Sequence, residues 1–139
     1  MLVLDTSALV KLYLQEEGRE QVLQAVQQFE VVALATLALP EAAAIFARMA
    51  QAGAFTVSEA QKAHSALLKD WPGFYRVRLT SDLALEASAL ARSHLLRGAD
   101  AVHLATATWL AREHKGIRFL AFDEELNRAA RVVVKVWGE

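Results

Sequence analysis

The sequence contains no cysteine, and this absence excludes disulfide bonds, thiolate metal sites and cysteine nucleophiles together. No stretch approaches the ~18 uncharged apolar residues that a membrane-spanning helix requires. The first residues include an acid at position 5 and no basic cluster, so we expect no signal peptide and no membrane partner. These absences favour a protein that works in the reducing cytoplasm.

No charge of either sign dominates, because 15 lysine and arginine residues are balanced by 16 aspartate and glutamate residues. A formal net charge of −1 neither requires nor excludes a polyanionic partner. A nucleic acid would therefore have to be held by local basic residues and by bound metal. Hydrophobic residues make up 55% of the chain, which is ample for a core, and 139 residues fit one domain covering 1–139.

Five short apolar runs, partly β-branched, are separated by longer segments with helical periodicity. The runs are Met1–Leu4, Val31–Leu34, Tyr75–Leu79, Arg118–Phe122 and Val132–Val136. The predicted helices are Arg19–Phe29, Glu41–Ala52, Ser58–Trp71, Ser81–Arg97 and Asp100–Ala111. Strands that alternate with helices imply right-handed crossovers and a parallel sheet covered on both faces. The sequence therefore predicts an α/β domain with a central parallel sheet of about five strands flanked by helices.

Four acidic residues fall where strands are expected to end or helices to begin. Asp5 directly follows the first apolar run, and Asp123 follows the fourth. Glu41 and Asp100 each start a predicted helix. Ligands of an open parallel sheet collect just beyond the carboxyl ends of its strands. We therefore expect the four carboxylates to converge in one polar pocket at that edge of the sheet.

Carboxylates gathered in this way suit a divalent metal. Mg²⁺ and Mn²⁺ prefer oxygen ligands, usually a few carboxylates together with water and substrate phosphate. Without a cation, crowded carboxylates repel one another and raise one another's pKa. A bound ion removes that repulsion, activates a water molecule and stabilises the leaving oxygen in phosphodiester hydrolysis. Zinc suits the sequence poorly, because the histidines show no paired spacing and no cysteine can join them.

Each acid also has a purely structural interpretation. Asp5 and Asp100 are both placed to cap the start of a helix, a position that favours aspartate. Asp123 heads the segment Asp-Glu-Glu-Leu, and acids are common in a first helical turn. Glu41 would be an exposed first-turn acid, although the apolar Ile45 one turn later indicates that this face points inward. Taken singly, none of the four residues decides between structure and catalysis.

Four segments of the chain resemble the motifs of a known family. In chain order they are Val-Leu-Asp5-Thr-Ser, Leu-Pro-Glu41, Arg-Gly-Ala-Asp100-Ala-Val-His-Leu-Ala-Thr-Ala and Phe-Leu-Ala-Phe-Asp123-Glu-Glu-Leu. In order and spacing they are similar to the acidic motifs of PIN domains, especially toxins of the VapBC type. The resemblance covers essentially the whole chain. One departure is Ala121, which stands where the family often has a threonine or serine two residues before the fourth acid.

The resemblance implies an endoribonuclease that depends on Mg²⁺ or Mn²⁺ and hydrolyses RNA phosphodiester bonds. Asp5 and Asp100 would be the central metal ligands, and Glu41 would complete the site. Asp123 would be an outer or water-mediated ligand, beside which Ala121 supplies no hydroxyl to orient a metal-bound water. The resemblance further implies the toxin of a type II toxin–antitoxin pair, with a cognate antitoxin as partner and a homodimer as its assembly.

Composition independently predicts self-association. The mean hydropathy of +0.23 is rather high for a small domain. The stretch Thr36–Phe55 holds more apolar side chains than one helical face can hide, namely Leu37, Leu39, Ile45, Phe46, Met49 and Phe55. Large exposed apolar patches usually mark interfaces.

Other residues near the motifs have weaker claims on the site. Ser7 would contact a metal-bound water or cap a helix. His103 lies one turn beyond Asp100 on the same face, where a hydrogen-bonded core histidine is the commoner interpretation. Four cations, Lys11, Arg97, Arg128 and Arg131, would hold phosphates or only solvate the surface. Three aromatic residues, Trp71, Phe74 and Tyr75, would stack on RNA bases or pack a loop.

Other functions remain to be weighed against this interpretation. A receiver-like phospho-acceptor domain needs an acidic pair after its first strand, where this chain has Thr6 and Ser7. A haloacid-dehalogenase-like phosphatase needs an aspartate in place of Ser7. The main alternative is a catalytically inactive PIN fold that serves as an RNA-binding or protein-interaction module. The presence of all four acids argues against it, whereas Ala121 and the balanced charge keep it open.

Overall fold

The computed structural model describes all residues from 1 to 139, and a four-stranded parallel sheet lies at its centre. The strands are β1 (Leu2–Leu4), β2 (Val32–Ala35), β3 (Tyr75–Val77) and β4 (Arg118–Leu120). They pair in the order β3-β2-β1-β4, and Leu2 lies between Val32 and Arg118 in the register. β1 is therefore an interior strand, and all three of its residues are fully buried.

Helices fill the connections between the strands. They are α1 (Thr6–Lys11), α2 (Arg19–Gln27), α3 (Ala38–Gln51), α4 (Val57–Asp70), α5 (Ser81–His94), α6 (Gly98–Glu113) and α7 (Glu124–Val133), with a 3₁₀ turn η1 (Trp71–Gly73) after α4. None of these helices has both the length and the apolar character needed to cross a lipid bilayer. The predicted α/β class and the parallel sheet are confirmed.

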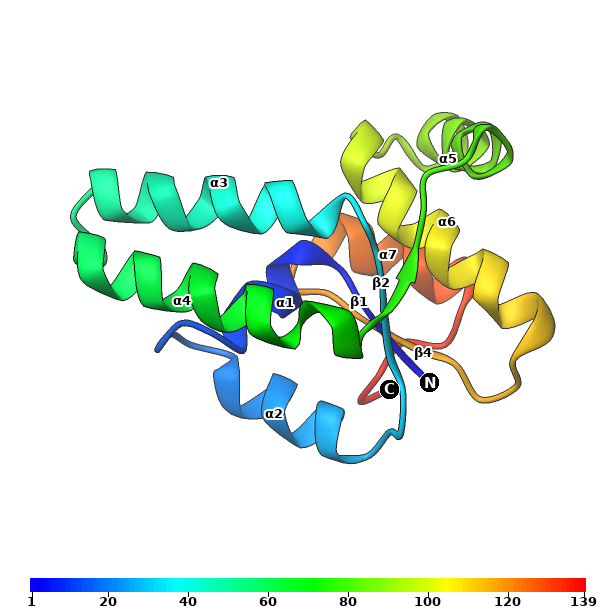
Figure 1. Ribbon diagram of the computed structural model, residues 1–139. Helices are drawn as coiled ribbons and strands as arrows, with labels where there is room; N and C mark the ends of the chain where they lie inside the picture. Colours follow the sequence, from blue (N-terminus) through cyan, green and yellow to red (C-terminus); the bar gives the residue numbers. More distant parts are fainter.

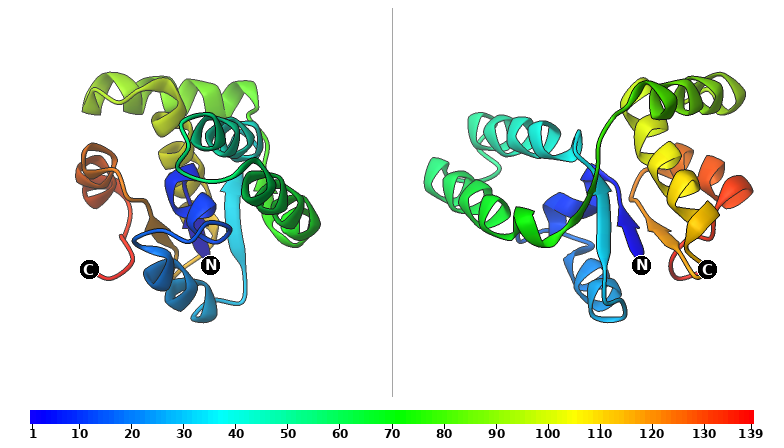
Figure 2. Two further views of the ribbon diagram at one scale, coloured as in Figure 1. Left: turned by 90° about the vertical axis from the view of Figure 1, so that its left-hand side faces the viewer. Right: turned by 45° about the vertical axis from the view of Figure 1, so that its right-hand side comes forward.

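Alternate residues of the strands face two different sets of helices. Val3 and Phe119 join residues of α5, α6 and α7 in the largest core cluster. Leu2, Leu4 and Leu120 pack instead against α1 and α2. The right-hand view of Figure 2 shows α5, α6 and α7 on one side of the sheet and α1 and α2 on the other. Burial on both faces explains why these strands are continuous apolar runs in the sequence.

The helices α3 and α4 form a hairpin that extends away from the sheet (Figure 1). The hairpin is anchored by a second core cluster, in which Leu9 of α1 and Leu34 of β2 meet Phe46 and Leu67. Because α3 starts soon after β2, its first turn stays at the sheet while its far end projects outward. Side chains in that first turn are therefore close to the carboxyl edge of the sheet.

The strand order contains one topological switch. From β1 the chain moves outward through β2 to β3, and it then returns to the opposite side of β1 to form β4. The loops that leave β1 and β4 therefore diverge, and an open α/β sheet binds its ligands in the crevice at such a point. Asp5 is the first residue beyond β1, and Asp123 lies just beyond β4. The fold thus places both aspartates beside the switch point.

The fifth predicted strand is wrong, and the sheet has four strands. Of the run Val132–Val136, the first two residues end α7, and only Val136 pairs with the sheet, through an isolated bridge to Phe119. The reason lies in α7, which already buries Leu126 and Ala130 and carries its helical conformation into the start of this run. The run Val132–Val136 is therefore mainly the apolar end of a helix and not a strand.

The loop between α1 and α2 packs against the loop that carries Asp123. Gly18 in the first loop has a φ of +90°, and a Cβ on it would lie 2.7 Å from Cε1 of Phe122 and 3.0 Å from Cδ of Lys11. Phe122 directly precedes Asp123, so this close contact supports the position of the fourth acid. Only glycine meets both the backbone and the space requirement here.

We predict that Gly18→Ala lowers the free energy of unfolding by about 2–4 kcal/mol, because left-handed backbone strain and overpacking add together. Gly53→Ala is the matched control, since Gly53 has a φ of +77° but no atom within 4 Å of an added Cβ. This control should lose only about 1 kcal/mol. Urea denaturation measures both losses, and equal losses would contradict a contribution from the Phe122 contact.

Candidate active site

Asp5 is the single residue between the central strand β1 and the helix α1. It is the N-cap of α1, and its Oδ1 accepts a hydrogen bond from the N–H of Ala8 at 2.9 Å. The Ser7 hydroxyl donates to the same carboxylate, at 2.7 Å from Oδ1 and 2.9 Å from Oδ2. Asp5 is only 3% exposed. The capping role considered from the sequence is therefore real, and it fixes the orientation of a buried carboxylate.

The protein environment makes ionisation of Asp5 unfavourable. Burial raises the pKa of Asp5 from 3.8 to about 6, and the nearby carboxylate of Asp100 adds to this effect. The charge of His103 and the hydrogen bonds from Ser7 and Ala8 act in the opposite direction but do not cancel it. The cost of burying the Asp5 carboxylate is therefore only partly compensated by its surroundings.

Asp100 lies in the first turn of α6 and is close to two charged neighbours. The N-cap of α6 is Arg97, so the interpretation of Asp100 as an N-cap residue is wrong. The Arg97 Nε lies 3.6 Å from Asp100 Oδ2, and its Nη2 lies 3.7 Å from Asp123 Oδ2. Because the Arg97 side chain is 84% exposed, these long ion pairs contribute little to stability.

The acids influence one another electrostatically. Partial burial raises the pKa of Asp100, and the charges of Asp123 and Glu41 raise it further. Arg97 and His103 lower it, but the net direction is upward. The negative charges of the other acids therefore make ionisation of Asp100 less favourable.

Asp123 occupies the N-cap of α7, just beyond β4. Its Oδ1 accepts a hydrogen bond from the N–H of Leu126 at 2.9 Å, while Oδ2 faces Arg97. The Asp123 side chain is 34% exposed, compared with 22% for Asp100. Oδ1 of Asp123 thus caps α7, and Oδ2 remains available on the side of Arg97.

Glu41 reaches the pocket from the first turn of α3. The Thr6 hydroxyl donates to Glu41 Oε1 at 2.7 Å, and His103 Nε2 lies 2.6 Å from the same oxygen. Partial burial raises the pKa of Glu41, but the hydrogen bonds from His103 and Thr6 outweigh burial and leave it below its ordinary value. Glu41 is therefore held in its ionised form.

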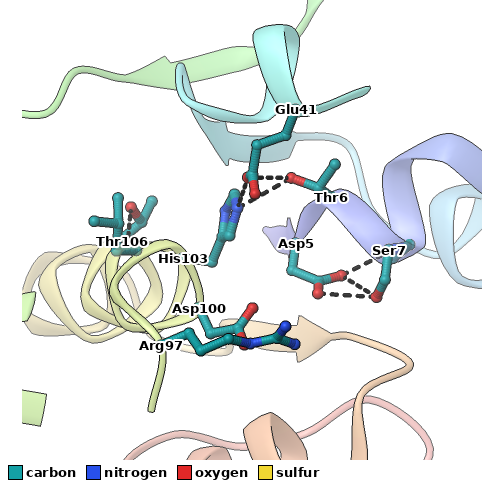
Figure 3. Close-up of polar contacts among 10 residues, drawn as sticks. Asp5, Thr6, Ser7, Glu41, Arg97, Asp100, His103 and Thr106 are labelled. Carbon is teal, nitrogen blue, oxygen red and sulfur yellow. Dashed lines mark hydrogen bonds and ion pairs between the residues drawn. The ribbon is translucent and has the colours of Figure 1, made fainter. Parts of the chain in front are cut away.

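The carboxylates lie around one space although they come from separate elements. Figure 3 shows Glu41 on α3, Asp5 beyond β1 and Asp100 on α6 surrounding this space. The loops that carry Asp5 and Asp123 are joined, because the N–H of Phe122 donates to the Ser7 hydroxyl at 2.9 Å. Neither this contact nor the one between Thr6 and Glu41 could be predicted from the sequence, because each joins residues far apart along the chain.

The pocket suits a divalent cation in its chemistry but not in its present side-chain arrangement. No three acidic or histidine side chains are already placed to hold a single ion. The acids take protein partners instead, as Asp100 and Asp123 do with Arg97. Carboxylate oxygens are nevertheless the ligands that Mg²⁺ and Mn²⁺ prefer. Because the burial of Asp5 is also only partly compensated, the donor set fits such an ion once the side chains reorient.

The cations considered from the sequence are placed very differently. Arg97 alone forms ion pairs with the acids of the pocket. Lys11 lies 4.7 Å from the centre of the Phe122 ring and pairs with a glutamate of its own loop. Arg131 forms ion pairs with Glu124 at the start of α7 and with Glu139, and Arg128 is exposed. Of these four cations, Arg97 is therefore the one that lies at the acidic pocket.

The aromatic residues considered from the sequence lie at the base of the hairpin. Trp71 and Phe74 pack edge to face, with ring centres 6.3 Å apart, against the core cluster of α3 and α4. Tyr75 is 47% exposed on the edge strand β3. Trp71 and Phe74 thus pack a loop, which was the structural interpretation of these residues.

Fold and pocket together define a small α/β domain with a carboxylate site at its topological switch point. The chain belongs to the PIN domain family, whose sequence model matches residues 2–132. It is 36% identical to Ribonuclease VapC45 of Mycobacterium tuberculosis over 130 residues, which cover 91% of this chain and 86% of that protein. The family indicated by the sequence motifs is therefore confirmed.

Solved structures share the fold at low sequence identity. FitAcB from Neisseria gonorrhoeae has a TM-score of 0.73 and 19% identity, covering 99% of this chain and 97% of that one. A toxin–antitoxin complex from Klebsiella pneumoniae has a TM-score of 0.62 and 19% identity, covering 88% and 87%. At this identity the likeness shows that the fold is the same.

The raised pKa of Asp5 predicts how stability depends on pH. The folded, metal-free protein keeps a proton that the unfolded chain releases as the pH rises from 3.8 to about 6. The contribution of Asp5 to the free energy of unfolding should therefore fall by up to about 3 kcal/mol across this range. Asp5→Asn keeps the helix cap but removes the titrating group.

The measurement is urea denaturation of wild type and Asp5→Asn between these pH values, in the presence of EDTA. The difference in free energy of unfolding between the two proteins isolates Asp5 from other titrating groups. It should shift in favour of Asp5→Asn as the pH rises. Parallel profiles would contradict the raised pKa.

Proposed function

We propose that this PIN-domain protein is a metal-dependent endoribonuclease that acts as the toxin of a type II toxin–antitoxin pair. The observation that carries the proposal is the buried carboxylate of Asp5, which shares a pocket with Asp100 at the switch point of the sheet. The 36% identity to Ribonuclease VapC45 over most of both chains supports the same class of reaction, hydrolysis of RNA phosphodiester bonds.

In this proposal Asp5 and Asp100 are the central ligands of a Mg²⁺ or Mn²⁺ ion. Glu41 completes the site, and Asp123 is an outer ligand. When bound, such an ion supplies an activated water and stabilises negative charge on the leaving oxygen. The Ser7 hydroxyl keeps the Asp5 carboxylate oriented toward the pocket. Hydrolysis breaks one P–O ester bond of the RNA and adds the elements of water across it.

Arg97 holds the substrate in the proposed reaction. Its side chain is largely exposed and makes only long contacts with Asp100 and Asp123, so it can turn toward a phosphate at little cost. A guanidinium binds two phosphate oxygens at once, which positions as well as attracts the backbone of RNA. A chain with a net charge of −1 needs such local contacts to hold a polyanion.

An inactive PIN fold that only binds RNA or protein is not favoured. All four acids are retained at one edge of the sheet, and burial of the Asp5 carboxylate is unfavourable unless a cation makes use of it. The methyl group of Ala121 is buried in the main core cluster. Asp123 is oriented by its bond to the N–H of Leu126 and does not need a hydroxyl at position 121 for this purpose.

We predict that Asp5→Asn and Asp100→Asn each reduce RNA cleavage by at least about 100-fold while the protein remains folded. Each exchange preserves shape and removes one charge from the proposed metal site. Asp123→Asn should reduce cleavage less, because Asp123 is the more exposed acid and Asn also caps α7 well. Cleavage of a structured RNA mixture with Mn²⁺ and thermal melting of each variant provide the two measurements.

Asp82→Asn is the matched control, since Asp82 is an exposed first-turn acid of α5 and makes no ion pair. It should cleave RNA at the wild-type rate. Unchanged cleavage by Asp5→Asn and Asp100→Asn would exclude a metal site at these residues. Wild-type cleavage that survives EDTA would exclude metal dependence.

The proposal also includes a protein partner. The neighbour from Klebsiella pneumoniae is a toxin–antitoxin complex, and its fold matches most of this chain. We propose a cognate antitoxin that binds this protein and blocks access of RNA to the acidic pocket. Cleavage of RNA and its inhibition would both take place in the cytoplasm.

We propose that two copies of the chain associate through the α3–α4 hairpin. The apolar side chains of 36–55 are less exposed than the sequence suggested, because α4 covers part of α3; Ile45, Met49 and Phe55 are only partly exposed. What remains is a groove of about 490 Å³ between the two helices. It is lined by four alanines, Phe46 and Val57, together with the polar residues Gln51, Gln61 and His64.

We predict that the protein is a dimer at high micromolar concentration and that Ala47→Glu, which puts a charge into this groove, makes it monomeric. Ala47 is exposed, so the substitution should change the free energy of unfolding of the monomer by less than about 0.5 kcal/mol. Sedimentation equilibrium measures the mass of both proteins. A monomeric wild type would contradict self-association, and a dimeric Ala47→Glu would place the interface elsewhere.

A further inference from the structure

One histidine of the core has its only hydrogen-bond partners at the edge of the acidic pocket. His103 is 2% exposed in the middle of the buried face of α6. Its Nε2 lies 2.6 Å from Glu41 Oε1 and 3.0 Å from the Thr6 hydroxyl. An ionised carboxylate can only accept hydrogen bonds, so Nε2 carries the proton and donates to Glu41.

The other ring nitrogen of His103 lowers the stability of the folded protein. His103 Nδ1 is buried and has no hydrogen-bond partner. Burial of a polar atom without a hydrogen-bond partner lowers the stability of the fold. Neighbouring residues of α6, such as Ala101, Leu104 and Ala105, are apolar and fully buried. A leucine in place of His103 would suit this environment better. The reason for an imidazole here is therefore its hydrogen bond to Glu41.

The two hydrogen-bond partners of Glu41 both contact the same carboxylate oxygen. Thr6 and His103 both contact Oε1, and Oε2 accepts no hydrogen bond from the protein. The Glu41 side chain is 31% exposed and belongs to the hairpin, whereas His103 belongs to α6 on the other side of the pocket. Without the bond from His103, only the Thr6 hydroxyl would hold the flexible glutamate side chain against turning to solvent.

We infer that His103 is a positioning residue, which fixes the Glu41 carboxylate through Oε1 and presents Oε2 to a divalent cation in the pocket. This inference rests on the proposed function, because it assumes that Glu41 is a ligand. Hydrogen-bond partners of metal ligands orient them before the ion arrives, and their loss typically weakens metal binding by about 10–100-fold. The contribution of His103 is therefore to metal affinity and not to the stability of the fold.

The experiment measures Mn²⁺ affinity by isothermal titration calorimetry and the melting temperature of the metal-free protein. His103→Leu should weaken Mn²⁺ binding by about tenfold or more and leave the melting temperature unchanged or higher, since it removes the unpartnered Nδ1. His103→Gln should restore most of the affinity, because its amide N–H can occupy the place of Nε2. These two opposite responses distinguish positioning from packing.

Thr106→Val is the matched control. Thr106 is fully buried in the same helix, and its hydroxyl donates to the carbonyl of Val102 rather than to Glu41. Its substitution should leave Mn²⁺ affinity unchanged. In addition, His103→Leu should have little further effect on Mn²⁺ affinity in a Glu41→Gln background, because His103 acts through Glu41.

The outcomes separate this inference from the proposed function. A wild-type protein that binds no Mn²⁺ would overturn both. Wild-type binding that His103→Leu leaves intact would overturn the positioning role of His103 and leave the nuclease proposal standing. A His103→Leu variant that loses its fold, or a Thr106→Val variant that weakens Mn²⁺ binding equally, would show that His103 serves the core and would also overturn the inference.

Discussion

Burial of the Asp5 carboxylate at the end of the central strand is the constraint on which the rest of the site depends. β1 is paired on both sides, so its carboxyl end cannot move away from the core. Ser7 and the N–H of Ala8 donate hydrogen bonds to Asp5, but neither brings a positive charge. A buried ion without an opposite charge is strongly unfavourable. A cation bound there, as in the proposed function, would relieve this cost, which arises from where the fold ends its first strand.

The remaining acids reach this point because two polar links join separate parts of the fold. The hydroxyl of Ser7 receives a hydrogen bond from the loop after β4, which brings Asp123 beside the end of β1. Glu41 is bonded to Thr6 at the start of α1 and to His103 on α6, which draws the hairpin toward the sheet. The shape of the pocket is thus maintained by hydroxyl and imidazole groups rather than by contacts between the acids.

The sequence predicted those features that depend on local order along the chain. The positions of Asp5 and Asp123 at strand ends follow from short apolar runs, and parallel pairing then places them on one edge. The bond between His103 and Glu41 could not be predicted, because it joins residues 62 apart and depends on where the fold places α3 relative to α6. Periodicity also failed at the run Val132–Val136, since it does not distinguish a short strand from an apolar helix end.

The strand order also determines when the pocket can exist during synthesis. β1 is made first, yet one of its two neighbours in the sheet is β4, which is made after every other strand. Until β4 has left the ribosome, the end of β1 has an unpaired edge, and the loop that carries Asp123 has no place to dock. The growing chain therefore cannot bring Asp123 beside Asp5 before β4 is made. Any activity that needs all four acids begins only after the last strand has joined the sheet.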